Sequence, residues 1–333
     1  MLSNVKSGLI TLTDLSGLSR LASRVNRHKV VVLCFHSISR LDEHEFCPGV
    51  FISRIQFIQV LDYLKQSHYQ VISLSEAKRH LKGEVTYDYP VVITIDDGWY
   101  PSVMDMLPIL EDYGFHATLY VTTYYVRHQV PVVNVCLAYL LWKSGAGSIR
   151  FILGEKERKV SGSHREIIEQ TESLLRSSGD IEKKMCLEAI ADDLKVSKEL
   201  FWLRIFENAT FEDLRKANGS GYMNFQLHTH RHRVPEDAGL LAEEIHKNRL
   251  LLQDGLGPTL DFNDFCYPSG VWRESQFKQL QGLGIESATT LDEGLNAVDC
   301  NLLSLKRNLV ADNRSLSHLK LAMSGLKGLL RGR

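Results

Sequence analysis

The chain has 333 residues, of which 44% are hydrophobic and 24% are charged. This composition is typical of a globular protein with a sizeable core and excludes a largely disordered chain. Lys and Arg together number 39 against 40 Asp and Glu, so no net positive charge attracts a polyanion, and nucleic acid is not an expected partner.

Cysteine usage and the lack of a targeting segment bear on the compartment. The six cysteines form no CxxC pair, and several lie in apolar runs such as VVLCFH, which is typical of small core residues in a reducing compartment. Residues 1–29 lack the pattern of a secretory signal, and no apolar run is long enough to span a bilayer. We therefore expect a cytoplasmic protein.

In the first part of the chain, strand and helix patterns alternate. Residues 1–29 are expected to form an N-terminal extension with helical spacing of Leu and Ile over residues 9–25. Apolar runs predict strands at 30–38, 69–74, 90–98 and 117–123, and helical periodicity predicts helices at 53–69 and 103–114. This alternation indicates βαβ units, an α/β fold and a parallel sheet.

The alternation stops between residues 130 and 208, where the pattern predicts a helical insertion with few strand signals. Such an insertion could cover the functional site and select the substrate, serve as an interaction surface, or be a peripheral structural element. After it, helix and strand patterns return, with strand candidates at FQLHTH, FCYPSG, ESATTL and LLSLKRNLV.

The motif TIDDG closes the buried strand at 90–98. Asp96 and Asp97 therefore lie at the carboxyl end of a strand, where α/β folds gather catalytic groups. Because two adjacent carboxylates repel each other, we expect one of them to be neutralised by a cation or to hold a proton. The alternative is a strand-to-helix turn in which an Asp caps the next helix.

The motif HTHRH supplies three histidines at alternate positions. His228 and His232 share a face if the chain turns there, and two imidazoles with one carboxylate suit zinc or a related divalent metal. Three protein ligands leave open positions, as in catalytic sites. His230 is expected to point elsewhere, in a supporting or substrate-contacting role. The alternative is a solvated basic strand end.

In this order, and each at a strand end, TIDDG, HTHRH and FCYPSG resemble the motifs of the polysaccharide deacetylase family, also known as NodB-homology or carbohydrate esterase family 4 proteins. The resemblance begins near VVLCFHSI and runs to about Gly325. It implies a distorted (β/α) barrel over residues 30–325, interrupted by the helical insertion at 130–208, and metal-dependent removal of acetyl groups from an N-acetylated sugar or glycan precursor.

The resemblance also implies roles for single residues. Asp96 would be the general base for a metal-bound water that acts as the nucleophile, and the metal ligands would be Asp97, His228 and His232. The turn that would bind the oxyanion comprises Tyr267, Pro268, Ser269 and Gly270. Zinc is the expected metal, although cobalt, nickel and iron suit the same ligands.

The sequence departs from the family pattern in two motifs. Where the family commonly has RxPxG, Cys266 stands in place of the Arg, and we expect Arg307 either to replace it by pairing with Asp96 or to be a surface residue. The late LxH motif has no clear match, and His318 is expected at the surface. His36 is better placed to line the pocket, unless it is a core histidine, and the general acid stays unassigned.

Two other functions remain open at this stage. One is a catalytically impaired carbohydrate-binding or scaffold protein, and the other is a hydrolase of non-sugar amides on the same fold. The stretch 319–333 continues into a basic tail at 326–333 and could hold the protein to the inner face of a membrane, although most such helices pack on their own domain. The oligomeric state is not predicted.

Overall fold

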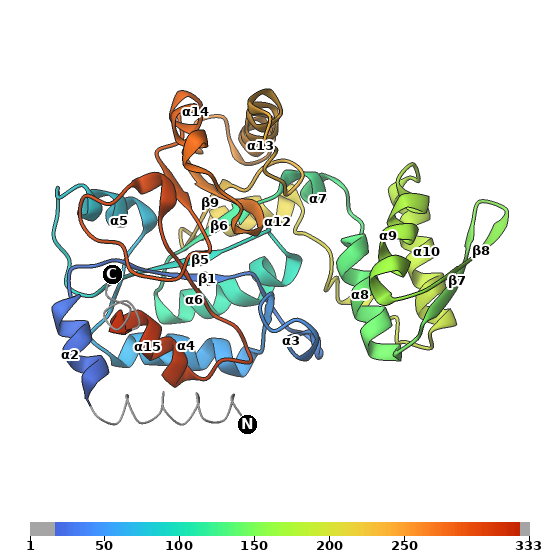
Figure 1. The fold of residues 1–333 in the computed structure, drawn as a ribbon, viewed down its shortest axis with the longest axis horizontal. Helices are drawn as coiled ribbons and strands as arrows, with labels where there is room; N and C mark the ends of the chain where they lie inside the picture. The colour runs from blue at the N-terminus through green and yellow to red at the C-terminus, as the bar shows by residue number, and fades with distance from the viewer. Residues whose placement is uncertain (1–16, 327–333) are drawn as a thin grey trace.

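The computed structural model describes residues 17–326. A parallel sheet surrounded by helices forms the larger body, and a smaller body of helices and one hairpin lies beside it (Figure 1). The fold is mixed α/β, and the expected distorted barrel is confirmed.

The main sheet has eight strands in the order β11, β10, β9, β6, β5, β1, β12, with β4 paired to β5, and its neighbours are all parallel. A parallel bridge from Thr289 to Leu305 brings the two outer regions of this curled sheet together. The strands are β1 Val31–Phe35, β4 Gln70–Val71, β5 Pro90–Ile95, β6 Ala117–Val121, β9 Met223–Leu227, β10 Asp264–Cys266, β11 Ser287–Thr289 and β12 Asn308–Leu309. A separate short pair is β2 Ser37–Ile38 with β3 Phe51–Ile52.

The central strands are apolar because both of their faces are covered. Every residue of β1, β5 and β6 is buried, as expected of parallel strands between helices and barrel interior. Since the strands are parallel, their carboxyl ends meet at one edge of the sheet. The residues that follow β1, β5 and β9 therefore converge there, which positions the functional side chains.

The helices outside the insertion are α2 Leu18–Val25, α3 Glu43–Phe46, α4 Arg54–Gln66, α5 Leu74–Leu81, α6 Leu107–Tyr113, α7 Thr123–Arg127, α12 Phe211–Asn218, α13 Ala238–Leu256, α14 Phe277–Gly282 and α15 Leu316–Ser324. A π-helical turn, Ser102–Met106, precedes α6, and 3-10 turns lie at Pro268–Gly270, Glu274–Gln276 and Leu302–Ser304. The predicted strand 69–74 is cut short because Ser73 and Glu76 form a capping box that begins α5.

The C-terminal helix α15 packs on the protein itself. Leu319 and Met323 join the main core, and Leu321 forms a small cluster with Ala22 of α2. For the stretch 319–333, the sequence allowed either membrane contact or packing on the protein's own domain, and this packing is the second of these. The last seven residues of the stretch lie outside the described part, as do residues 1–16. Within residues 17–326, no helix has the length and apolar character needed to cross a bilayer.

The sequence indicated a helical insertion, but the insertion contains strands as well as helices. It contains α8 Val133–Ser144, α9 His164–Leu175, α10 Asp180–Asp193 and α11 Glu199–Trp202, but also an antiparallel hairpin of β7 Ser148–Leu153 and β8 Lys156–Ser161. The hairpin forms because Ile149 and Phe151 alternate inward and Gly154 has a positive φ of 61° in the two-residue turn.

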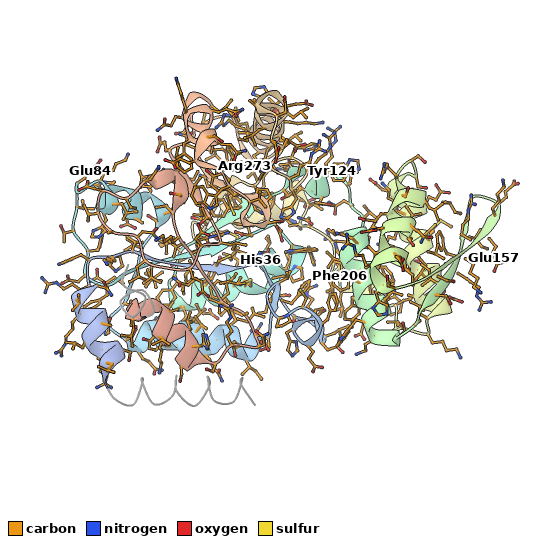
Figure 2. All side chains as sticks on the ribbon, in the orientation of Figure 1. His36, Glu84, Tyr124, Glu157, Phe206 and Arg273 are labelled. Carbon is orange, nitrogen blue, oxygen red and sulfur yellow. The ribbon has the colours of Figure 1, made fainter. Side chains whose placement is uncertain are left out.

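The core of the insertion is continuous with one side of the barrel. Phe51 and Trp99 of the barrel belong to the same buried cluster as the insertion residues Leu137 and Phe206. Figure 2 shows Phe206 at the junction between the two bodies. The insertion is therefore packed firmly against the barrel, while its predicted boundaries at residues 130 and 208 stay predictions.

Candidate active site

The carboxyl edge of the sheet carries an unusual concentration of strained backbone. Four residues other than glycine have a positive φ there: Asp97 (74°), Thr229 (60°), His232 (53°) and Ser269 (56°). Such conformations cost free energy and persist where surrounding contacts enforce them, which is common at functional sites. All four belong to the three motifs quoted from the sequence.

Asp97, His228 and His232 converge as the sequence predicted. The Oδ1 atom of Asp97 lies 3.2 Å from Nε2 of His228 and 3.2 Å from Nε2 of His232. The other oxygen, Oδ2, accepts a hydrogen bond of 2.9 Å from the indole Nε1 of Trp99. Nδ1 of His228 lies 2.9 Å from the carbonyl oxygen of Cys266, and a hydrogen bond to that acceptor leaves the Nε2 lone pair directed at Asp97.

This arrangement fits a divalent cation. The three ligand atoms lie within 4.8 Å of one another, and Oδ1 of Asp97 is buried without a hydrogen-bond partner among the described residues. Burial raises the pKa of Asp97, but the neighbouring imidazoles of His228 and His232 outweigh that effect and hold the pKa well below its usual value. Two nitrogen donors and an ionised carboxylate form a ligand set suited to zinc and related metals.

Asp96 has a different environment from its neighbour, because a buried arginine binds both of its oxygens. Arg307 Nη1 donates to Oδ1 at 2.7 Å and Nη2 donates to Oδ2 at 2.8 Å. Arg307 is only 1% exposed, so the alternative of a surface arginine is wrong, and the expected pair with Asp96 is present. Burial raises the pKa of Asp96, but the guanidinium of Arg307 dominates and lowers it to about 2.

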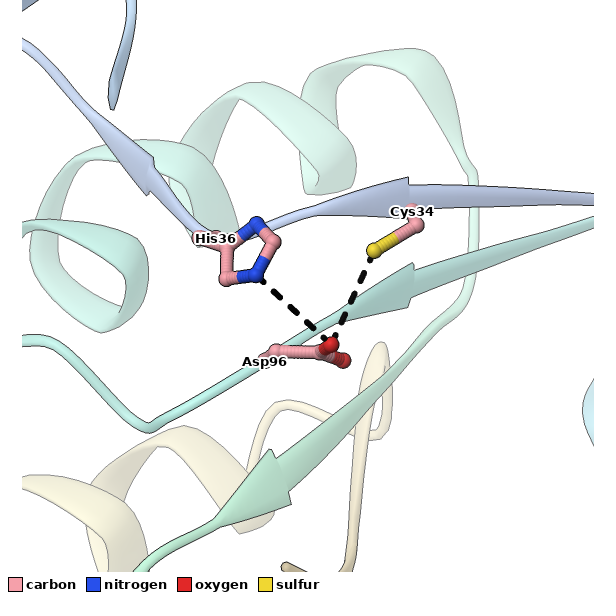
Figure 3. A group of neighbouring side chains, drawn as sticks. All are labelled: Cys34, His36 and Asp96. Carbon is pink, nitrogen blue, oxygen red and sulfur yellow. Dashed lines mark hydrogen bonds and ion pairs between the residues drawn. The ribbon is translucent and has the colours of Figure 1, made fainter. Parts of the chain in front are cut away.

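Two further groups of potential metal ligands share Asp96. One is Cys34, His36 and Asp96, drawn in Figure 3, and the other is Asp96, His228 and Cys266. A cation at either position would approach a carboxylate whose two oxygens already accept from the guanidinium of Arg307. Like-charge repulsion disfavours both positions, so the Asp97 group is the better cation site.

His36 lies beside the Asp96 carboxylate and lines the cavity. Its Nε2 is 3.8 Å from Oδ2 of Asp96, and its Nδ1 is buried without a hydrogen-bond partner in the described chain. Burial lowers its pKa below the usual histidine value. Asn208 also lines this cavity. Its Nδ2 donates to the Asp97 carbonyl at 2.7 Å, while its Oδ1 is buried and lacks a partner within residues 17–326.

The turn after β10 offers one backbone N–H to the cavity. The Tyr267 N–H donates to Thr289 O at 3.2 Å, the Gly270 N–H donates to Tyr267 O at 2.9 Å, and Pro268 has no N–H. Ser269 is therefore the residue of the turn whose amide is available, and it lines the cavity. Gly270 is required for packing, because a Cβ there would meet Cβ of Leu291 at 2.8 Å and its φ is 68°.

The arginines of HTHRHR are exposed, but each is paired with an acidic side chain. Arg231 and Arg233 both pair with the buried carboxylate of Glu244 on α13, at 3.3 and 2.9 Å. His230 turns away from the cation site, since its Nδ1 lies 3.1 Å from Thr123 Oγ1. Another residue of α13, Asn248, holds the strand end by accepting from the His228 N–H at 2.9 Å.

We predict that Asn248→Ala weakens metal binding by about 10- to 100-fold, the usual cost of removing a group that orients a ligand. The amide of Asn248 fixes the backbone of His228 and also donates to Val121 O at 3.0 Å, so its loss frees the ligand. Titration with zinc measures the change. Asn224→Ala, at an exposed position of β9, is the matched control and should bind zinc like wild type. Equal affinities in the two variants would contradict the role of Asn248.

We also predict an acid-sensitive contribution from Asp96. Because its folded pKa of about 2 lies below the usual 3.8, the contribution is fully present above about pH 4 and is lost as the pH falls through about 2. The shift corresponds to about 2 kcal/mol of unfolding free energy. Urea unfolding at several pH values should show a shallower decline below pH 4 for Asp96→Asn than for wild type. Parallel declines would show that Asp96 does not have this pKa.

Sequence reasoning missed four supporting residues: Trp99, Asn208, Glu244 and Asn248. A signal existed for the last two, because they are polar residues on the buried face of α13, together with Leu241, Ile245 and Leu252. Buried polar groups at apolar helix positions need partners and so indicate a network. Trp99 and Asn208 had no such pattern.

The family model described as polysaccharide deacetylase matches residues 84–146, which include TIDDG. No curated protein matched. Among solved structures, the deacetylase PplD from Streptococcus pyogenes, in complex with acetate, has a TM-score of 0.60 and 19% identity, covering 89% of this chain and 99% of its own. IcaB from Ammonifex degensii has a TM-score of 0.58 and 19% identity, covering 89% and 97%. A de-N-acetylase from Aggregatibacter actinomycetemcomitans has a TM-score of 0.56 and 13% identity, covering 88% and 99%.

Fold and site together define an α/β barrel with a candidate cation site at the carboxyl ends of its strands. The resemblance to the polysaccharide deacetylase family is confirmed by the matched family model and by the shared fold. The matched family model carries the description of a deacetylase, and the fold is shared with solved deacetylases.

Proposed function

We propose that the protein is a metal-dependent hydrolase that removes N-acetyl groups from an N-acetylated sugar or glycan precursor. The observation that carries the proposal is the placement of two kinds of carboxylate in one cavity. Asp97 faces two imidazoles in a geometry suited to a cation, and Asp96, 2% exposed, is held by Arg307. One site thus combines a candidate metal centre with a candidate general base.

Asp97, His228 and His232 would hold the metal, which when bound supplies Lewis acidity toward the amide carbonyl and lowers the pKa of water. Asp96 is ionised above about pH 2 and can accept the proton of the attacking water. Arg307 fixes its orientation and keeps it charged. The Ser269 N–H would donate to the oxygen on which negative charge develops.

His36 is the proposed carrier of a proton to the leaving amine. Its Nε2 lies 3.8 Å from Oδ2 of Asp96, so a proton accepted by Asp96 can pass to this imidazole after a small movement. The unpartnered Oδ1 of Asn208 can accept a hydrogen bond from a substrate N–H or hydroxyl. Of these two residues, the sequence had suggested His36 but not Asn208.

The scaffold alternative rested on the missing Arg of RxPxG and on the missing LxH motif. Arg307 contacts Asp96 in place of the missing Arg. The expected partner is therefore an N-acetylated carbohydrate acting as substrate. The cytoplasmic location and peripheral membrane contact stay predictions.

The test is metal content by elemental analysis together with acetate release from N-acetylglucosamine oligomers. We expect about one divalent metal ion per chain. We also expect acetate release that disappears with a chelator and returns with added metal. Purified protein that binds no metal after reconstitution and releases no acetate would contradict the proposal. Release from simple N-acetylated amines at the same rate as from sugars would favour the non-sugar amidase.

A further inference from the structure

The cavity that contains the candidate metal site has a volume of about 550 Å³ and extends from the barrel to the insertion. Its lining changes character along this path. The barrel end is polar, with His36, Asp96, Asp97, His228 and His232. Asp97, His36 and Asn208 line this same cavity and each has a buried polar atom without a hydrogen-bond partner among the described residues, so the barrel end suits polar groups of a ligand.

The insertion end is apolar. Phe46 and Val50 line it from the segment before β3, Val135 and Ala138 line it from α8, and Ile168 lines it from α9. Phe46, Val50, Val135 and Ile168 also pack against the core of the insertion, which supports the apolar wall from behind. The wall is therefore a built part of the fold, composed of residues from two separate bodies.

A sugar chain alone matches this wall poorly. Each hydroxyl that enters an apolar wall without a hydrogen-bond partner loses its contacts with water. Asn134 is the polar side chain that α8 contributes to the lining, and it is exposed. An aliphatic chain, in contrast, gains free energy for each methylene transferred from water to such a wall.

We propose, building on the deacetylase function above, that the natural substrate is an amphipathic one: an N-acylated amino sugar that carries an aliphatic chain. The amino sugar and its amide occupy the polar barrel end, and the chain lies against α8 and α9. Two sources could supply this chemistry, namely a long N-acyl group or a lipid attached to the sugar as aglycone. The insertion then acts as the part of the enzyme that selects the substrate.

Two pairs of probes test the proposal and separate the sources. Octyl and methyl glycosides of N-acetylglucosamine report on a lipid aglycone, and N-octanoylglucosamine and N-acetylglucosamine report on the acyl group. Octyl probes are kept below their micelle-forming concentration. We expect kcat/KM for the octyl member of one pair to exceed that of its short partner by about tenfold or more, since each buried methylene contributes up to about fourfold. Ratios near one in both pairs would overturn the proposal.

A matched pair of substitutions locates the effect. Ala138→Asp places a carboxylate on the apolar wall and should bring the octyl-to-short ratio close to one. Ala146→Asp adds the same group to the loop after α8, outside the cavity, and should leave the ratio unchanged. Val135→Thr, nearly the same in shape, should lower the ratio severalfold even if Ala138→Asp folds poorly. An unchanged ratio in both wall variants would overturn the proposal.

Calorimetric binding of the same probes distinguishes failure of this inference from failure of the proposed function. Tighter binding of an octyl probe without hydrolysis of any probe would support the apolar site while contradicting the deacetylase activity. Hydrolysis of all probes with equal affinities and equal kcat/KM would support the activity while overturning the amphipathic substrate.

Discussion

His228→Ala is expected to lose bound metal and activity together, whereas Asp96→Asn is expected to keep the metal and lose activity. The reason is that the two carboxylates after β5 have different partners. Asp97 faces the imidazoles at 3.2 Å, while both oxygens of Asp96 accept from Arg307. Removal of the metal costs several kcal/mol of transition-state stabilisation, or about 10³-fold in rate, and removal of a general base costs about 10² to 10⁴-fold.

Elemental analysis and acetate release, measured on the same protein batches, check this expectation. His230→Ala is the matched control within the same motif, because its imidazole contacts Thr123 and not Asp97. This control should retain the metal. Full turnover by Asp96→Asn would show that another group is the base, and retention of metal by His228→Ala would place the metal elsewhere.

The second large effect is expected on stability, from Arg307→Met. This substitution removes one partner of a buried ion pair and leaves the carboxylate of Asp96 without compensation in the barrel interior. Breaking a buried pair in this way costs about 3 to 5 kcal/mol. Urea unfolding at neutral pH, where Asp96 is charged, measures the loss.

A surface pair provides the comparison for this second effect. Arg314 pairs with Glu293 at 2.8 Å, but the arginine side chain is 41% exposed, so Arg314→Met should cost at most about 1 kcal/mol. The double variant Asp96→Asn with Arg307→Met should recover part of the stability lost in the single variant, because it removes both charges. If Arg307→Met were as stable as Arg314→Met, the pair would contribute little to folding.

Much of the site was predictable because it lies in local motifs at strand ends. Burial of an apolar strand places the residues after it at the carboxyl edge, so TIDDG and HTHRH indicated His228, His232 and one of two carboxylates from spacing and chemistry. The family resemblance then implied that the ligand is Asp97. The pair between Asp96 and Arg307 joins residues 211 positions apart, and it was suggested only because Cys266 stands where the family commonly has an Arg. Its burial could not be read from LKRNLV.

Other features depend on tertiary contacts that a linear pattern does not carry. The hairpin β7–β8 was missed because its two strands contain few apolar residues. Its exposed face carries polar residues such as Arg150 and Lys159. Asn208 contacts the Asp97 backbone only because the chain returns to the barrel after the insertion. The apolar wall was also invisible, since it combines α8 and α9 with a segment about one hundred residues earlier.

The position of Arg307 has a consequence for how the protein is made. Asp96 is synthesised early, directly after β5, while its partner Arg307 arrives just before β12, the last strand of the sheet. Until that strand docks beside β1, the interior would hold an unpaired negative charge, which strongly opposes closure of the barrel. Assembly of this ion pair therefore waits for nearly the whole chain, and a ribosome-bound or truncated fragment ending before residue 307 should neither close the barrel nor show activity.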